Sequence, residues 1–398
     1  VLNIKQISKK DEVLLSEINK NLEINLSNLK KENFPLSYFD NNNGRTEYNG
    51  KLKSISRYKF KKIEKFNEYE PEVILDNQNI LFFDNKGTIL KFDQNSKLIW
   101  KKNYYSKSEK KLSPFLFMTT KNNLLIVVDT IAKTFAMDIE TGELIWSNYN
   151  LSPFNSQIKI FKNKFYAVDT KNILRCFSVT DGKELWNYKT DVPFIKSQKR
   201  TSLIVKSNKV IFNNTIGDIT AVDSDTGDLL WQTPTQSKKI YDESMFFKNS
   251  DLITAKNSIL FSNNNNNFYS LNSKDGVLNW KQKINSHIKP VYFNGLIFTV
   301  TNEGYLAVIN NENGNIIRST YLFNSFKPKK RKNIKPIGFI VGKKNIYLTL
   351  SNGRLMVIDT SKGSIESILK IDKEKISTPV VQGQNLYITK NNSIIKLN

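Results

Sequence analysis

Short runs of β-branched and aromatic residues recur along the chain and alternate with polar turns. One example is Lys209-Val210-Ile211-Phe212, which is followed by a Gly217-Asp218 turn and then by Ile219-Thr220-Ala221-Val222-Asp223. Such pairs of runs are typical of β-hairpins, and they lack the 3.6-residue spacing of apolar positions in a helix. We predict eight of these hairpins, which begin near Asn79, Asn123, Lys164, Lys209, Asn257, Asn294, Asn345 and Asn385.

One motif follows four of the eight hairpins, and a copy at Asp93–Trp100 lacks one residue of the turn. An Asp or Asn opens a turn that ends in Gly, and a Trp comes four residues after the Gly. The motif predicts a tight turn, because the Asx side chain accepts backbone N–H bonds and Gly adopts positive φ. The Trp can fill the space between neighbouring sheets, with its indole N–H bound to a carbonyl. These structural roles are predicted for Gly142, Gly182, Gly227, Gly276, Trp100, Trp146, Trp186, Trp231 and Trp280.

Degenerate copies complete the series. Asn310–Arg318 and Asp359–Ser367 keep the turn but lack the Trp. The stretch Leu52–Phe60 supplies the eighth final strand, with Tyr58 in the Trp position. The copies are about 44 residues apart, as expected for four-stranded propeller blades. We therefore predict an all-β, eight-bladed β-propeller over residues 46–398, whose N-terminal strand completes the last blade and closes the ring.

Residues 1–45 differ from the repeats and form a predicted N-terminal extension. The apolar residues between Asp11 and Lys31 lie close to helical spacing: Val13, Leu14, Leu15, Ile18, Leu22, Leu26 and Leu29. The spacing predicts a partly helical extension. Three roles remain open for it, namely packing on the propeller, tethering the propeller to a membrane anchor, and docking a partner.

Composition indicates a folded chain with a strongly basic surface. Hydrophobic residues make up 39% of the 398 residues and aromatic residues 12%, which is enough for a packed core. The formal net charge of +23 favours anionic partners, although the lysines are scattered through turns as in a solvated coat. We interpret the densest basic run, Lys327–Lys332, as a solvated loop, with contact to anionic lipid or lipopolysaccharide as the alternative. It lacks interleaved aromatic residues, so no nucleic-acid partner is expected.

The chain offers little for catalysis. The single cysteine, Cys176, excludes an intrachain disulfide and a thiolate metal cluster, and its place in the repeat matches Ala136 and Ala221, which predicts a core position. The only histidine, His287, falls between predicted blades, where a general base would lack a pocket. No acidic cluster has the spacing of a Ca²⁺ site, so we expect no metal and no cofactor.

The ends of the chain and its hydropathy bear on the compartment. No apolar run approaches the roughly 18 residues of a membrane-spanning helix. The sequence opens on Val1 rather than Met. We therefore expect a processed leader upstream, in which a signal peptide or a lipid-bearing cysteine would lie.

The Asp-x-x-Thr-Gly-x-x-x-Trp motif resembles the repeat of the quinoprotein (PQQ-repeat) propellers from about residue 50 to residue 398. Within that family, quinone-dependent alcohol dehydrogenases are larger and have a catalytic Asp, a Ca²⁺ site and a vicinal cysteine pair. The BamB-like branch of outer-membrane assembly lipoproteins has the length and blade number predicted above, and an Asp-Val-Pro loop that matches Asp191-Val192-Pro193 here. The resemblance to this second branch is the closer one.

The resemblance implies both a function and a site. It implies a non-enzymatic scaffold at the periplasmic face of the outer membrane of a Gram-negative bacterium. One copy would dock a BamA-like protein within a larger assembly, and a lipid anchor would give peripheral membrane association. The alternatives are a PQQ-dependent oxidoreductase-like protein and a basic propeller that binds anionic lipid or polysaccharide. The residues implied to contact the partner are Ile195, Gln198, Lys199, Arg200 and, in the next inter-blade loop, Asp251.

Overall fold

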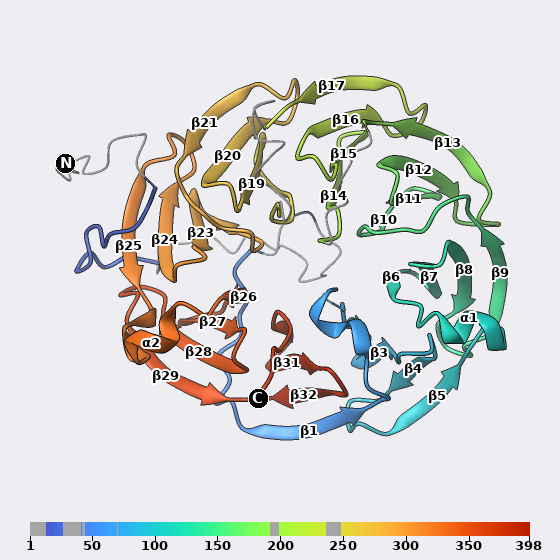
Figure 1. The fold of residues 1–398 in the computed structure, drawn as a ribbon, viewed down its shortest axis with the longest axis horizontal. Helices are drawn as coiled ribbons and strands as arrows, with labels where there is room; N and C mark the ends of the chain where they lie inside the picture. The colour runs from blue at the N-terminus through green and yellow to red at the C-terminus, as the bar shows by residue number, and fades with distance from the viewer. Residues whose placement is uncertain (1–12, 27–40, 42–43, 70, 192–198, 236–247) are drawn as a thin grey trace. The chain divides into compact units, whose positions relative to one another are not determined.

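The computed structural model describes residues 13–26, 41, 44–69, 71–191, 199–235 and 248–398, which contain eight four-stranded sheets (Figure 1). The predicted eight-bladed, all-β propeller is thus confirmed. We number the sheets as blades 1 to 8 along the chain. Two compact units can be separated, a first unit of Val1–Lys53, Lys248–Lys390 and Leu397–Asn398 and a second unit of Ser54–Phe247 and Asn391–Lys396.

The second unit contains blades 1 to 4, each with its strands in sequence order. Their strands are β2 (Ile74–Asp76), β3 (Asn79–Phe83), β4 (Ile89–Phe92) and β5 (Leu98–Lys102); β6 (Leu116–Lys121), β7 (Leu124–Asp129), β8 (Lys133–Asp138) and β9 (Leu144–Tyr149); β10 (Lys159–Phe161), β11 (Lys164–Val168), β12 (Ile173–Ser178) and β13 (Glu184–Lys189); and β14 (Leu203–Lys206), β15 (Lys209–Asn213), β16 (Ile219–Asp223) and β17 (Leu229–Thr233). A 3₁₀ turn, η1 (Glu64–Asn67), precedes blade 1, and a short helix, α1 (Lys107–Lys111), joins blades 1 and 2.

The first unit contains blades 5 to 7, built in the same way. Their strands are β18 (Ile253–Ala255), β19 (Ser258–Asn263), β20 (Asn267–Asn272) and β21 (Leu278–Gln282); β22 (Val291–Phe293), β23 (Leu296–Val300), β24 (Tyr305–Asn310) and β25 (Ile316–Tyr321); and β26 (Pro336–Val341), β27 (Asn345–Leu350), β28 (Arg354–Asp359) and β29 (Ile365–Lys370). Between blades 6 and 7 lie a 3₁₀ turn, η3 (Phe323–Ser325), and a short helix, α2 (Pro328–Arg331).

Blade 8 combines the two ends of the chain. Its order is β1-β32-β31-β30, from β1 (Ser54–Lys59), β32 (Ser393–Leu397), β31 (Asn385–Lys390) and β30 (Val380–Gln382). Tyr58 of β1 is fully buried and donates a hydrogen bond from its hydroxyl to the Gln94 carbonyl at 3.0 Å, in the turn that precedes β5 of blade 1. The N-terminal strand therefore lies beside β32, as predicted, and closure of a ring through it stays a prediction.

Every blade from 1 to 7 has the same irregularity between its third and fourth strands. In blade 3, Cys176 lies opposite Trp186 while Phe177 lies opposite Glu184, so that Leu185 is an extra residue. A bulge of this kind interrupts the in–out alternation of side chains. The core position predicted for Cys176 is confirmed, since the residue is fully buried and burial raises the pKa of its thiol to about 12.

The fourth strand of one blade packs on the turn of the next blade through an aromatic–glycine contact. Gly182 has a φ of +70°, and a Cβ built on it would lie 2.4 Å from Cζ3 of Trp146. Gly227 stands in the same relation to Trp186, and Gly314 to Trp280. The indole ring occupies the space that any side chain at these positions would need, so the turns require Gly for contact as well as for backbone conformation.

A hydrogen bond accompanies this contact. It is accepted by the carbonyl of the residue that follows the first residue of the turn. Trp146 donates to Val179 O at 3.0 Å, and Trp280 donates to Asn311 O at 2.9 Å.

Other side chains supply the donor where the Trp does not. Ile139 O accepts from Lys91 Nζ at 3.0 Å, and Ser224 O accepts from the Tyr166 hydroxyl at 3.0 Å. The indole N–H groups of Trp100, Trp186 and Trp231 have no acceptor among the described residues. This departs from the predicted indole–carbonyl bond at all three residues. At Trp100 and Trp186, a different side chain of the same blade donates to the corresponding carbonyl.

Arg318 takes the Trp position in blade 6. Its side chain is fully buried, and it donates hydrogen bonds to Thr360 O at 3.1 Å, to Ser361 O, and to Leu22 O at 3.1 Å. Burial lowers the pKa of Arg318 to about 10, with the nearby Asp359 carboxylate opposing the shift. Arg318 thus replaces one indole donor with a guanidinium that binds the blade 7 turn and the N-terminal segment together.

Residues 13–26 are not helical, which corrects the prediction for this part of the extension. The segment lies beside β25 (Figure 1), where Ile18 forms an antiparallel bridge with Ser319. Leu14 N donates to Lys283 O, and Ile24 N donates to Ser361 O, both at 2.9 Å. The spacing suggested a helix, but Leu14, Ile18 and Ile24 are buried while the backbone N–H groups bind blades 5, 6 and 7. The rest of the predicted helix lies outside the described residues.

Substitution of the inter-blade glycines tests the aromatic contact. We expect Gly182→Ala to lower the free energy of unfolding by about 3 kcal/mol, because it combines an unfavourable φ with displacement of Trp146. Gly295→Ala is the matched control, since Gly295 also has positive φ (+79°) but nothing within 4 Å of the added Cβ. It should cost about 1 kcal/mol. Urea unfolding measures both values. Equal losses of stability in the two variants would contradict the aromatic–glycine contact.

Candidate partner-docking site

The loop that follows blade 3 is the part of the chain singled out by the resemblance. Ile195 and Gln198 lie outside the described residues, but the two ends of the loop are described. Asn172 Nδ2 donates to Asp191 O at 2.8 Å, which holds the first end on blade 3. Thr201 N donates to Asn155 O at 2.9 Å, which holds the second end just before β10. The loop therefore leaves and re-enters a fixed base.

Arg200 makes an ion pair inside the chain. Its Nη1 atom contacts Oε1 of Glu72, a residue that immediately precedes blade 1, and the two side chains are only 8% and 14% exposed. Removing one partner of an ion pair that is this deeply buried strongly destabilises the folded protein, because the other charge is left without a partner. Arg200 thus links the end of the loop to a segment far away in the sequence. Lys199, beside it, is partly exposed.

Asp251 is buried rather than displayed. The residue lies just before β18, is 7% exposed, and its carbonyl accepts a hydrogen bond from Ser250 Oγ at 3.1 Å. Ser250 Oγ also accepts from Ser262 N at 2.9 Å, so this segment is fixed to β19. The described residues of the predicted set thus divide into two anchored positions, Arg200 and Asp251, and one more accessible position, Lys199.

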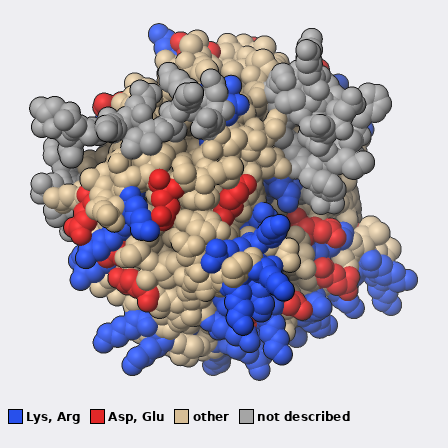
Figure 2. Space-filling model, turned by 60° about the vertical axis from the view of Figure 1, so that its left-hand side comes forward, with Lys and Arg blue, Asp and Glu red and all other residues tan. Residues whose placement is uncertain are grey.

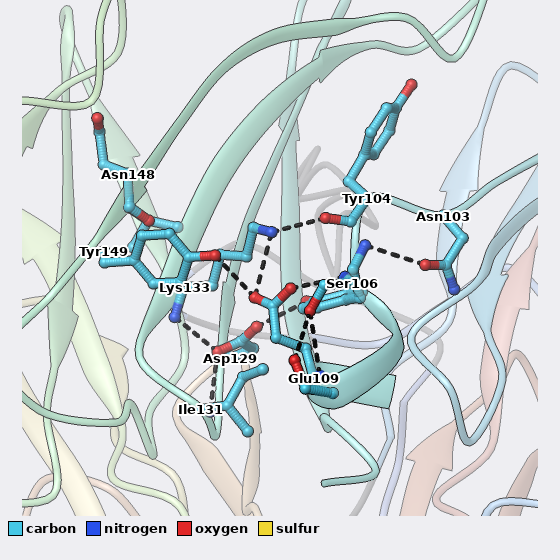
Figure 3. Close-up of polar contacts among 12 residues, drawn as sticks. Asn103, Tyr104, Ser106, Glu109, Asp129, Ile131, Lys133, Asn148 and Tyr149 are labelled. Atoms are coloured by element: carbon cyan, nitrogen blue, oxygen red, sulfur yellow. Dashed lines mark hydrogen bonds and ion pairs between the residues drawn. The ribbon is translucent and has the colours of Figure 1, made fainter. Parts of the chain in front are cut away.

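A polar cluster that the sequence did not indicate joins α1 to blade 2 (Figure 3). Lys133 Nζ donates to Tyr104 O at 2.6 Å and lies 3.3 Å from Oε1 of Glu109. The ammonium group also lies over the rings of Tyr105 and Tyr149, at 5.0 and 5.3 Å from their centroids. Cation–π contacts and an ion pair therefore hold the lysine from several sides.

Two carboxyl groups of this cluster differ in their surroundings. Asp129 opens the turn before β8, and its Oδ1 atom accepts from the N–H groups of Ile131 and Lys133, while Oδ2 accepts from the Tyr105 hydroxyl at 2.6 Å. Burial raises the pKa of Asp129 to about 6, and these hydrogen bonds only partly oppose the rise. For Glu109, burial acts in the same direction, but bonds from Ser106, Tyr149 and Lys133 outweigh it and lower the pKa to about 2.

The arrangement fixes the loop that contains α1. Ser106 and Glu109 form a capping box at the start of α1, and the Ser-x-x-Glu spacing is the one signal of the cluster visible in the sequence. Within the ranges that the structure describes, no group of three His, Cys, Asp or Glu side chains could hold a metal ion. The described residues contain no helix with the length and hydrophobicity of a membrane span.

The strand order and the repeated blade define the protein class as a β-propeller of eight four-stranded blades. The model of the family described as outer membrane protein assembly factor BamB matches residues 85–320, more than half of the chain. The chain belongs to this family.

Individual proteins agree with the assignment. The outer membrane protein assembly factor BamB of Moranella endobia is 21% identical over 287 residues, which cover 69% of each chain. The crystal structure of BamB from Moraxella catarrhalis has a TM-score of 0.71 at 13% identity, over 87% of this chain and 99% of the other. The computationally designed Ika8 protein has a TM-score of 0.67, also at 13% identity, over 88% and 99% of the two chains. At these identities the structural likenesses show the fold alone.

The ion pair of Arg200 predicts a stability effect. We expect Arg200→Met and Glu72→Gln each to lower the free energy of unfolding by about 2–3 kcal/mol, because each leaves one buried charge without its partner. The double variant should lose less than the sum, with a coupling of about 1 kcal/mol or more. Lys189→Met, at an exposed position of β13, is the control and should change stability by less than about 0.5 kcal/mol. Strict additivity in urea unfolding would contradict the pair.

The raised pKa of Asp129 predicts a pH dependence of stability. The pKa is about 6 in the folded protein against an ordinary value of 3.8, so folding takes up a proton between these pH values. Relative to Asp129→Asn, the native protein should be most stable below about pH 4 and lose about 2–3 kcal/mol as the pH rises to 7. Urea unfolding at several pH values measures the difference.

Glu109→Gln should show the opposite sign. The pKa of Glu109 is lowered to about 2, so its stabilising contribution is present above its ordinary pKa of 4.5 and is lost as the pH falls toward 2. The pair of variants therefore serves as an internal control. The native protein and Asp129→Asn should differ in their free energy of unfolding by an amount that changes with pH. A difference that stays constant between pH 4 and 7 would contradict the raised pKa of Asp129.

Proposed function

We propose that the chain is a non-enzymatic scaffold of outer-membrane β-barrel assembly. It docks a BamA-like protein, and polypeptides destined to become barrels, through its inter-blade loops at the periplasmic side of the outer membrane. The observation that carries this proposal is membership of the BamB family over more than half of the chain. The anchored loop between Asp191 and Thr201 supports it, because both ends of that loop are held by hydrogen bonds.

A propeller built in this way suits a docking role. Blades locked by aromatic–glycine contacts and carbonyl bonds move little, so loops on them lose less conformational freedom when a partner binds. Stable docking surfaces combine a few apolar anchors with polar groups around them. Within the loop, Ile195 is the apolar anchor, and Gln198 and Lys199 are the polar neighbours.

Arg200 and Asp251 take supporting roles in this proposal. Arg200 fixes the end of the loop through Glu72 and acts on partner binding by positioning. Asp251, buried before β18, belongs to the packing of blade 5. The contact itself is made by residues upstream of Arg200.

A binding assay with a purified BamA-like partner tests the assignment. We expect Ile195→Asp combined with Lys199→Glu to weaken binding by about tenfold or more, because the change removes an apolar anchor and reverses a charge at the same site. The matched control is Val277→Asp with Lys281→Glu, which makes the same chemical changes at an exposed turn and strand of blade 5. It should bind as the native protein does.

Two outcomes would count against the proposal. Native-like binding by the loop variant would remove the loop from the contact. Equal losses in the loop variant and the control would show a general dependence on surface charge and hydrophobicity. Thermal unfolding of both variants establishes that they fold.

A further inference from the structure

The segment 314–358 has an extreme charge composition. It contains ten Lys and Arg residues and no Asp or Glu. Its densest part, which we call the basic loop, runs from Lys327 to Lys335 and includes α2. Figure 2 turns the side of the molecule that carries α2 toward the viewer, and Lys and Arg side chains gather there in a patch.

The basic loop stands on a rigid apolar base. Phe323 and Ile334, on either side of α2, are 1% and 3% exposed and belong to the core shared by blades 6 and 7. Phe326 packs against the same core and lies 6.1 Å from Phe323. The base fixes the loop at both ends, so α2 and its lysines are presented as a preorganised surface.

The only arginine of the basic loop has an internal role. Arg331 Nε donates to Phe326 O at 2.8 Å, and Nη2 donates to Asn324 O at 3.2 Å. The guanidinium also lies 6.0 Å from the Tyr321 ring. Arg331 therefore closes the loop on itself, and the charges left for a partner are those of the lysines.

These lysines are exposed. In the described parts of the chain, no carboxylate lies within ion-pair distance of Lys327, Lys329, Lys330, Lys332 or Lys335. Some lysines elsewhere do have a counter-charge. Lys162 and Lys164, for example, share the carboxylate of Asp225 at 3.2 and 2.9 Å.

We propose that the basic loop docks on a phospholipid bilayer whose headgroups are anionic. Lysine ammonium groups are compact point charges, and several of them on one exposed loop suit a diffuse layer of phosphates, each contributing about 1 kcal/mol near such a surface. An acidic protein partner would more often be met by free arginine forks, and here the one arginine is engaged. Single-stranded nucleic acid would need exposed aromatic rings among the lysines. This role goes beyond the proposed scaffold function and does not depend on it.

Vesicle co-sedimentation of the full chain tests the proposal. We expect binding to vesicles of phosphatidylcholine with phosphatidylglycerol and none to phosphatidylcholine alone. Lys327→Gln, Lys329→Gln, Lys330→Gln and Lys332→Gln together should weaken partition onto the anionic vesicles by about tenfold or more. Binding should also fall as the ionic strength rises, because salt screens exposed charges.

A second variant separates the loop from the overall charge of the protein. It removes the same number of charges from exposed positions on or beside the fourth strands of other blades, by Lys97→Gln, Lys101→Gln, Lys189→Gln and Lys281→Gln. This control should bind as the native protein does. An equal loss in both variants would overturn the proposal in favour of diffuse charge, and so would native binding by the loop variant.

Competitors distinguish the sources of negative charge. Inorganic phosphate should displace the protein from vesicles no more than chloride does at the same ionic strength. Specific displacement by phosphate would overturn the membrane role in favour of a small-anion site. Tight binding to polyglutamate or single-stranded DNA without binding to anionic vesicles would overturn it in favour of a macromolecular partner.

Discussion

One hydrogen bond recurs between neighbouring blades. A backbone carbonyl near the start of a turn accepts it from a side chain of the preceding blade. Within the two units the donor can be an indole, an ammonium, a phenol or a guanidinium, as at Trp146, Lys91, Tyr166 and Arg318. The acceptor position is constant while the donor changes. A buried carbonyl without a partner is costly, so the junction tolerates a change of donor but not its loss. The Gly later in the same turn leaves room for side chains of the fourth strand of the preceding blade to pack against the turn.

The fold could be predicted from the sequence because its determinants are local and repeated. Hairpin runs, Asx–Gly turns and the Trp four residues later all lie within one blade, and Tyr58 could be placed by counting strands. The N-terminal segment shows the limit of such patterns. Leu14 and Ile18 have helical spacing, but their backbone groups are bound by strand β25 and by loops that lie about 300 residues away in the chain. Propensity is a weak guide when tertiary partners satisfy the backbone in another way.

The candidate site was harder to predict, because its contacts also depend on residues that are distant in the sequence. Ile195, Gln198, Lys199, Arg200 and Asp251 came from a family resemblance, which carries positions but not burial. Arg200 looked like a surface charge because nothing near it in sequence pairs with it, and its partner Glu72 belongs to another blade junction. The cluster of Asp129, Tyr105 and Lys133 was not predicted, because Tyr105 is distant in the sequence from the other two residues and contacts them only in the folded chain.

The contact between Arg318 and the Leu22 carbonyl has a consequence for anyone who handles this protein. The segment of residues 13–26 supplies a hydrogen-bond acceptor to a guanidinium that is buried between two blades. This segment is therefore part of the folded structure. Trimming the sequence to its repeats would strip that acceptor away and uncover the edge of β25 for pairing with other molecules. Tags and truncations belong upstream of residue 13, and a preparation that begins within the first blade should be checked for self-association before its binding properties are interpreted.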